Sequence, residues 1–294
     1  MKRQTQAYLY AISTVLLWST VASAFKISLR YLDVWQLLFV SSITATACLL
    51  ITLVYQKKQS LLRALNKNEL FRLLVFGLLN PFCYYLILFK AYALLPAQIA
   101  QTLNYTWAIT LMFLSIPILK HKVSRYDLLA SLICYTGVVI ICFRGEQFPD
   151  GTLDLSGIAL ALFSTLIWAI YWLYKTRDKI DAVVGLFVSF AFSLPFITLG
   201  CLVYSDFVFT NMTGILGGIY VGLFEMGITY ILWLLALQHT SSAAKISTLI
   251  FLSPFLSLFI IHYVVGETIA KSTVIGLLMI VCGLLVQRKS QAPA

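Results

Sequence analysis

Long apolar runs without charged residues are the feature that most restricts what this chain can fold into. Each run is close to the length of about 20 residues that an α-helix needs to cross the hydrocarbon core of a bilayer. Only 11% of the 294 residues are charged, whereas a soluble domain carries about a quarter, so a soluble domain is excluded. We therefore predict an all-α membrane protein with ten transmembrane helices, at residues 7–27, 34–55, 70–92, 97–119, 127–143, 156–174, 183–204, 212–237, 242–265 and 272–287.

The distribution of Lys and Arg over the connecting loops predicts the orientation of these helices. Ten spans place both termini on one side of the membrane; that side holds fifteen Lys and Arg residues, and the other side holds four. Cationic loops stay on the cytoplasmic side. We therefore expect a multi-pass protein of the bacterial inner membrane with both termini in the cytoplasm. The net charge of +10 then reflects orientation and does not indicate nucleic-acid binding.

The second half of the chain repeats the first at an offset of 145 to 146 residues. The aligned pairs are Gly77 with Gly222, Tyr85 with Tyr230, Ala91 with Ala236, Ala130 with Gly276 and Gly137 with Gly283, and Trp18 aligns with Trp168 at an offset of 150. This recurrence of the first segment argues against a cleavable signal peptide, which Lys2, Arg3 and the motif Ala22-Ser23-Ala24 would otherwise resemble.

Each half holds five spans, an odd number, so the second half must enter the bilayer from the opposite side. We expect two inverted five-helix repeats, at residues 7–143 and 156–287, joined by a periplasmic linker at residues 144–155. Inverted repeats typically place a substrate site near the membrane midplane and let one half rock against the other. The pattern therefore predicts a secondary transporter that works by alternating access.

Glu225 is the one acidic residue deep inside a predicted span, where a charge costs about 2.5 to 3.5 kcal/mol on insertion scales. It shares a helical stripe with the glycines from Gly214 to Gly222, which predicts that it faces protein. It either binds a substrate ammonium group or a coupling proton, or is protonated and hydrogen-bonded to a neighbouring helix. Its counterpart in the first half is Asn80, which precedes Pro81, and we expect both to face one cavity.

Other polar and aromatic residues inside the spans are further candidates for substrate binding. Lys245 would neutralise a substrate carboxylate, pair with Glu225 or extend to the interface. A polar stripe on the fourth span faces either another helix or a water-filled cavity, and it consists of Gln98, Gln101, Asn104 and Tyr105. The aromatic candidates for the walls of a cavity, which could equally be packing residues, are Trp18, Tyr84, Trp107 and Trp168.

Several short motifs resemble those of a known family. They are Leu17-Trp18-Ser19-Thr20, Ile167-Trp168-Ala169, Leu252-Ser253-Pro254, Gly266-Glu267 and the run from Ala236 to Lys245. They resemble the EamA-type carriers of the drug/metabolite transporter superfamily, which implies ten helices in two inverted five-helix repeats.

Within that family, Asn104-Tyr105-Thr106-Trp107 is similar to the Asn-Tyr-x-Trp motif of the YddG-type amino-acid exporters. The resemblance implies a central cavity lined at the positions of Asn80, Trp107 and Trp168. The chain departs from the family pattern at Ala108, where a proline usually stands, and at Lys120-His121, where Gly-Glu is expected.

These observations predict an exporter of small organic metabolites, amino acids or related compounds, with the lipid bilayer and a small-molecule substrate as its partners. The sequence shows no motif that pairs a catalytic nucleophile with a general base, no side chains at the spacing of metal ligands and no phosphate-binding glycine loop. We therefore expect no enzyme activity, metal or cofactor. An alternative is uptake of a sugar or nucleoside, in which Glu225 would accept hydrogen bonds from hydroxyls. Less favoured alternatives are an intramembrane enzyme and a non-transporting assembly subunit, which does not need a duplicated bundle.

Overall fold

The computed structural model describes residues 3–119, 124–143, 154–175, 177–240 and 249–290. Within these residues all regular secondary structure is helical, and no strand occurs. The elements are α1 (Arg3–Ser28), α2 (Val34–Tyr55), α3 (Gln59–Arg63), α4 (Lys67–Gly77), η1 (Leu78–Cys83), α5 (Tyr84–Leu94), α6 (Ala97–Asn104), α7 (Trp107–Leu119), α8 (Arg125–Phe143), α9 (Leu155–Lys175), α10 (Ala182–Tyr204), α11 (Met212–Val221), η2 (Gly222–Gly227), α12 (Ile228–His239), η3 (Leu249–Leu252), α14 (Ser253–Ile260), η4 (Ile261–Val265) and α15 (Lys271–Ser290).

Six helices in the described part of the chain are long and apolar enough to cross a membrane. They are Arg3–Ser28, Val34–Tyr55, Lys67–Leu94, Leu155–Lys175, Ala182–Tyr204 and Met212–Ala236, and the shorter apolar helices Leu249–Val265 and Lys271–Val286 follow them. The predicted span at 97–119 is divided into α6 and α7, and the one at 127–143 lies within α8. Residues 242–248, the first part of the predicted ninth span, lie outside the described residues. The chain is a multi-pass membrane protein.

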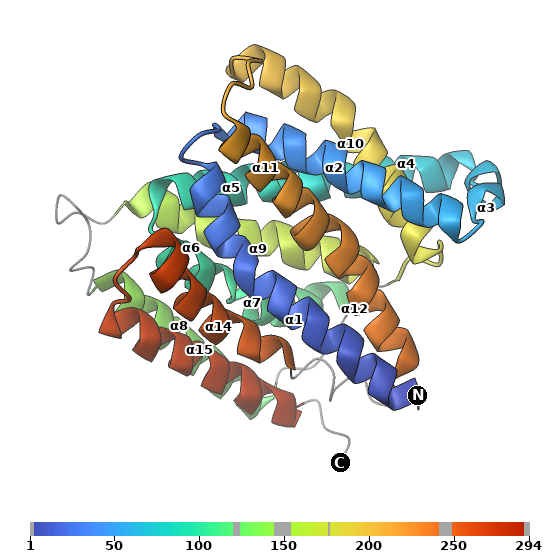
Figure 1. Ribbon diagram of the computed structural model, residues 1–294. Helices are drawn as coiled ribbons and strands as arrows, with labels where there is room; N and C mark the ends of the chain where they lie inside the picture. The colour runs from blue at the N-terminus through green and yellow to red at the C-terminus, as the bar shows by residue number, and fades with distance from the viewer. Residues whose placement is uncertain (1–2, 120–123, 144–153, 176, 241–248, 291–294) are drawn as a thin grey trace.

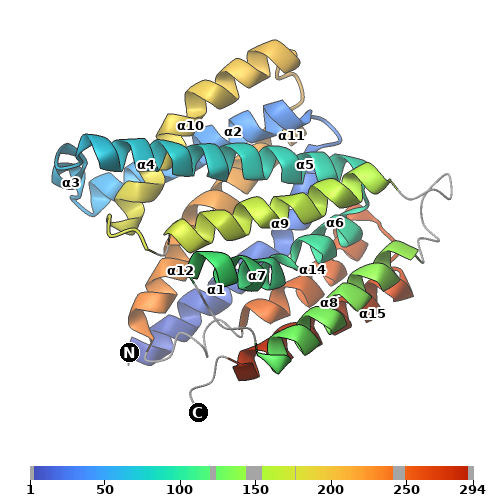
Figure 2. The same cartoon turned by 180° about the vertical axis from the view of Figure 1, so that it is seen from behind.

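Helices at corresponding positions of the two halves run in opposite directions. In Figure 1, α1 runs from lower right to upper left, whereas α9 runs from left to right. The directions of α2 and α10 are opposed in the same way, and Figure 2 shows the same arrangement from behind. The start of α1 and the end of α15 lie toward the same side of the bundle.

Glycines let helices from the two halves pack backbone to backbone. A Cβ on Gly77 of α4 would collide with the backbone carbonyl of Ser189 in α10. A Cβ on Gly137 of α8 would lie 2.7 Å from the carbonyl oxygen of Gly276 in α15, and the reverse contact is equally close. Small residues permit such close approach between membrane helices. Consequently α8 and α15 form a tight pair on one face of the bundle (Figures 1 and 2).

Two long helices are interrupted by wider turns at corresponding positions. The turn η1 separates α4 from α5; Pro81 lies in it, and Asn80 has non-helical dihedral angles of φ −148° and ψ 117°. Proline lacks the backbone N–H that would continue the helix. The turn η2 separates α11 from α12 and contains Glu225. Gly77 and Gly222, which are aligned in the two halves, stand at the beginning of these interruptions.

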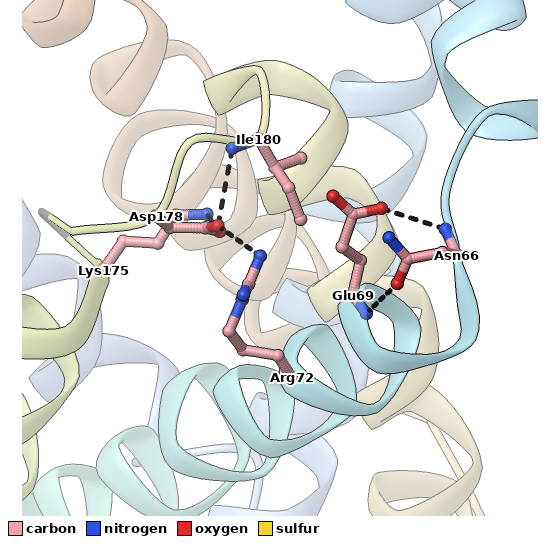
Figure 3. Close-up of polar contacts among 6 residues, drawn as sticks. All are labelled: Asn66, Glu69, Arg72, Lys175, Asp178 and Ile180. Atoms are coloured by element: carbon pink, nitrogen blue, oxygen red, sulfur yellow. Dashed lines mark hydrogen bonds and ion pairs between the residues drawn. The ribbon is translucent and has the colours of Figure 1, made fainter.

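Polar contacts tie α4 to the turn between α9 and α10, as Figure 3 shows. The side chain of Asp178 is only 1% exposed, and it accepts from Arg72 Nη2 at 2.8 Å and from Lys175 Nζ at 3.3 Å. Beside it, Asn66 and Glu69 cap the start of α4: Asn66 Oδ1 accepts from the backbone N–H of Glu69, and Glu69 Oε2 accepts from that of Asn66. These contacts bind the first half of the chain to the second at this end of the bundle.

Candidate functional site

A cavity of about 500 Å³ lies at the centre of the bundle, between α1, α5, α6, α7, α9, the segment from η2 to α12, and η3. Ten of its twenty lining residues are aromatic, and the others are mostly aliphatic. Small-molecule sites are typically concave, apolar and of this size, with few polar groups that orient the ligand. Glu225 is the single charged residue among the described residues of the lining.

The structure brings most of the predicted site residues to this cavity. Seven of them line it: Trp18, Tyr84, Asn104, Tyr105, Trp107, Trp168 and Glu225. Asn80 does not line it, because its side chain is fully buried at the kink in η1. Lys245 lies outside the described residues.

Glu225 reaches the cavity from the interrupted helix and is held there by a neighbouring helix. Its Oε1 accepts a hydrogen bond of 3.0 Å from the hydroxyl of Tyr85 on α5. Its Oε2 has no hydrogen-bond partner among the residues that the structure describes. Glu225 therefore both bonds a neighbouring helix and lines the cavity. One carboxylate oxygen is positioned and the other remains available to a ligand.

The polar stripe of the fourth predicted span divides between the cavity and the helix contacts. Asn104 lines the cavity and is fixed on two sides, since its Oδ1 accepts from Tyr84 at 3.4 Å and its Nδ2 donates to Ser164 at 3.0 Å. Gln101 also lines the cavity, and its buried Oε1 has no partner within the described residues. Gln98 instead bonds the turn between η4 and α15, donating to the carbonyl of Thr268 at 2.9 Å.

Stacked aromatic rings form one wall of the cavity. Tyr84 stacks on Trp168 with ring centroids 4.6 Å apart and an interplanar angle of 30°, and Trp172 meets Trp168 edge to face at 5.6 Å. Elsewhere in the lining Trp18 packs on Trp233 with ring centroids 5.7 Å apart. Aromatic pairs of this kind contribute stabilising free energy in addition to that of the apolar area they bury. The rings are therefore held in place before any solute binds.

Sequence reasoning missed several residues of this site and of its support. Trp172 and Trp233 line the cavity, and nothing in the sequence sets them apart from packing aromatics. Tyr85 holds Glu225, and its hydroxyl lies 3.4 Å from that of Tyr230. A signal for this pair was available, because the two tyrosines are aligned in the two halves and stand 145 residues apart.

A polar clamp closes the junction between α6 and the turn that precedes α15. Gly266 ends η4 with φ +83°, a conformation that favours glycine. The next residue, Glu267, accepts from the backbone N–H groups of Ala97 at 2.7 Å and Gln98 at 3.2 Å. A helix N-terminus has unpaired N–H groups and a partial positive charge, which a carboxylate satisfies. The Gly-Glu motif thus fixes the start of α6; we call this contact the Glu267 clamp.

Comparison with known proteins identifies the family. The model of the EamA-like transporter family matches the chain twice, at residues 5–143 and at residues 155–287. The chain belongs to the EamA-like transporter family. This membership agrees with the resemblance inferred from the motifs in the sequence.

The relatives of this EamA-family chain are themselves named as transporters. An uncharacterized transporter of Clostridium kluyveri is 26% identical over 299 residues, covering 98% of this chain and 95% of its own. The uncharacterized transporter YvbV of Bacillus subtilis is 23% identical and covers 98% and 94%. A crystal structure that is 19% identical has the same fold, with a TM-score of 0.69 over 98% of this chain and 99% of that one. The chain is a membrane transporter.

Proposed function

We propose that the chain is a secondary carrier of ten transmembrane helices, built as inverted repeats at residues 7–143 and 156–287 with a periplasmic linker at 144–155. Three observations support the inverted arrangement. The family model matches each half separately. Corresponding helices run in opposite directions in Figure 1. The aligned residues Tyr85 and Tyr230 meet hydroxyl to hydroxyl, as residues on a pseudo-twofold axis would.

The substrates in this proposal are small organic metabolites, amino acids or related compounds, which the carrier exports across the bacterial inner membrane by alternating access, with both termini in the cytoplasm. The observation that carries the proposal is the central cavity, with its aromatic walls and the carboxylate of Glu225. A cavity of about 500 Å³ accommodates a solute of this size. Its place between the halves suits a site that faces either side in turn.

Each group in the cavity has a role in the proposal. Glu225 binds the ammonium group of the solute or a coupling proton, and Tyr85 holds its carboxylate. Asn104 lies at the wall as a hydrogen-bonding group, and the rings of Trp18, Tyr84, Trp107 and Trp168 surround the apolar part. Lys245 remains a candidate for a substrate carboxylate, and Asn80, buried at the kink of η1, is given no role in the binding.

The test compares culture medium from cells that express the wild type or Glu225→Gln at matched membrane levels. We expect mass spectrometry to find amino acids or related amines enriched outside only with the wild type, because the substituted glutamine side chain keeps the shape but lacks the negative charge. Glu69→Gln is the matched control, since a glutamine at this half-buried capping position preserves the cap. Export by the Glu225→Gln variant equal to wild type would remove Glu225 from the mechanism.

If no amino acid or amine is enriched with either protein, export of this class is refuted. Proteoliposomes loaded with sugars or nucleosides then test the alternative of uptake.

A further inference from the structure

The described part of the cavity lining carries charge of one sign only. Among the described lining residues there is one carboxylate, Glu225, and no Lys, Arg or His. A carboxylate in a largely apolar surrounding attracts a cation more strongly than it would in water, because the local dielectric constant is lower. An anionic solute group placed beside Glu225 would be repelled for the same reason.

The carboxylate of Glu225 has one acceptor oxygen that is open to a ligand. Oε2 of Glu225 has no partner within the described residues, and neither does the buried Oε1 of Gln101. An acceptor without a partner in an apolar cavity carries an unrecovered desolvation cost. A ligand that donates hydrogen bonds recovers this cost, and an ammonium group provides up to three donors.

The aromatic wall next to Glu225 is suited to the same kind of group. Tyr85, which bonds Glu225, meets Tyr84 edge to face at 4.8 Å, and Tyr84 stacks on Trp168. Glu225, Tyr84 and Trp168 all line the cavity, and the buried Tyr85 joins the carboxylate to Tyr84 from behind the lining. The faces of aromatic rings attract cations, and Trp attracts them most strongly.

We propose that the cavity selects its solute through an ammonium group bound between Glu225 and the aromatic wall, and that a carboxylate on the solute is not required. The substrate class is then organic amines that carry an apolar, ring-sized body. Amino acids fall within the class through their amino group. This inference rests on the proposed carrier function and specifies what the carrier recognises.

Four probes with the same phenyl ring separate the contributions of charge. They are phenethylamine (a cation), phenylalanine (a zwitterion), phenethyl alcohol (neutral) and phenylpropionate (an anion). Binding to the purified full chain in lipid nanodiscs is measured by calorimetry. We expect phenethylamine to bind at least as tightly as phenylalanine, and the alcohol and the anion to bind at least about tenfold more weakly. Equal or tighter binding of phenylpropionate, or no binding of phenethylamine at millimolar concentration, would overturn the proposal.

Two variants locate the recognition. Glu225→Gln should weaken phenethylamine binding at least about tenfold and leave phenethyl alcohol unchanged. Lys245→Met should leave phenethylamine unchanged. If Lys245→Met abolishes phenylalanine binding and phenethylamine does not bind to the wild type, the solute carboxylate is the recognised group and the proposal is wrong. The wild-type probe series decides the question even where a variant does not fold.

Flux measurements separate this inference from the proposed function. Selective binding of phenethylamine without any flux in proteoliposomes would refute the carrier function and retain the recognition site. Flux of phenylalanine without binding or flux of phenethylamine would retain the carrier function and refute amine selectivity.

Discussion

The hydroxyl of Tyr85 decides how the carboxylate of Glu225 is presented to a solute. Tyr85 is fully buried and Tyr230 is 3% exposed, so neither hydroxyl forms its hydrogen bonds with bulk water. Tyr85 lies 3.0 Å from Oε1 of Glu225 and 3.4 Å from the hydroxyl of Tyr230. The carboxylate is thereby held at one oxygen, which leaves the other directed to the ligand. Fixing a binding group before the ligand arrives lowers the entropic cost of association.

Tyr85→Phe removes only the hydroxyl and should weaken phenethylamine binding about tenfold, since a hydrogen bond to a charged group contributes about 1.5–3 kcal/mol. Calorimetry in nanodiscs measures the change. Tyr135→Phe is the matched control, because Tyr135 is 41% exposed on α8 and lies away from the central cavity. An equal loss in both variants would show that the effect is general rather than due to Glu225.

The start of α10 illustrates how a single cap positions a whole element. Asp181 accepts from the backbone N–H groups of Val183 at 3.1 Å and Val184 at 3.2 Å, and it pairs with Lys58 Nζ at 2.7 Å. Partial burial by itself raises the pKa of Asp181, but the bonds from Lys58 and from the two backbone groups lower it further, so the pKa lies below its ordinary value. The folded state therefore favours the ionised form.

A depressed carboxylate pKa contributes stability above the unfolded-state value of about 3.9, and this contribution is lost as the pH falls through the lower folded-state value. At pH 7, Asp181→Ala should cost about 1 kcal/mol through loss of the cap. The gap between the two proteins should narrow as the pH falls below the unfolded-state value of about 3.9. Thermal unfolding in detergent, followed from pH 7 downwards, measures this difference, and a gap that stays constant would contradict it.

At the scale of the whole molecule, polar contacts join the two halves at both ends of the bundle. The Glu267 clamp joins α6 to the turn before α15, and the pairs Lys58–Asp181 and Arg72–Asp178 join the first half to the turn before α10. If access alternates, one of these sets must open while the other holds. The cavity would then face each side of the membrane in turn.

A disulfide or short thiol cross-link across the Glu267 clamp should stop transport and spare binding. The variant carries Ala97→Cys and Glu267→Cys in a background without the native cysteines. We expect flux in proteoliposomes to fall to background after cross-linking and to recover on reduction, with phenethylamine still bound by the cross-linked protein. The two single-cysteine variants control for oxidation itself. Undiminished flux in the cross-linked protein would exclude opening at this junction.

The extent of the helices could be predicted because the bilayer imposes it. The predicted span at 34–55 coincides with α2, where Asp33 caps the first turn and an apolar run follows. The division between α6 and α7 was not predictable, since neither proline nor glycine stands between Asn104 and Trp107. That break depends on contacts with other helices, such as the bond from Asn104 to Ser164.

A residue of the candidate site could be predicted where placing its side chain in an apolar span costs free energy. Glu225 was identified in this way, since a charge within an apolar run needs a partner. Alignment of the halves led to Asn80 as a residue of the cavity, but it does not indicate which way a side chain points at a kink, and Asn80 is buried. The same alignment contained Tyr85 and Tyr230, whose contact depends on how the halves pack against each other.

The tight pairing of α8 with α15 has a consequence for biogenesis. The ribosome delivers α8 to the membrane long before α15, and until then the glycine face around Gly137 has no helix against it. During this interval the small-residue surface of α8 faces lipid or a membrane-embedded chaperone. Insertion of α15 converts the exposed face into a closed pair. A nascent chain arrested before α15 would thus display a surface by which membrane quality control could distinguish it from the finished protein.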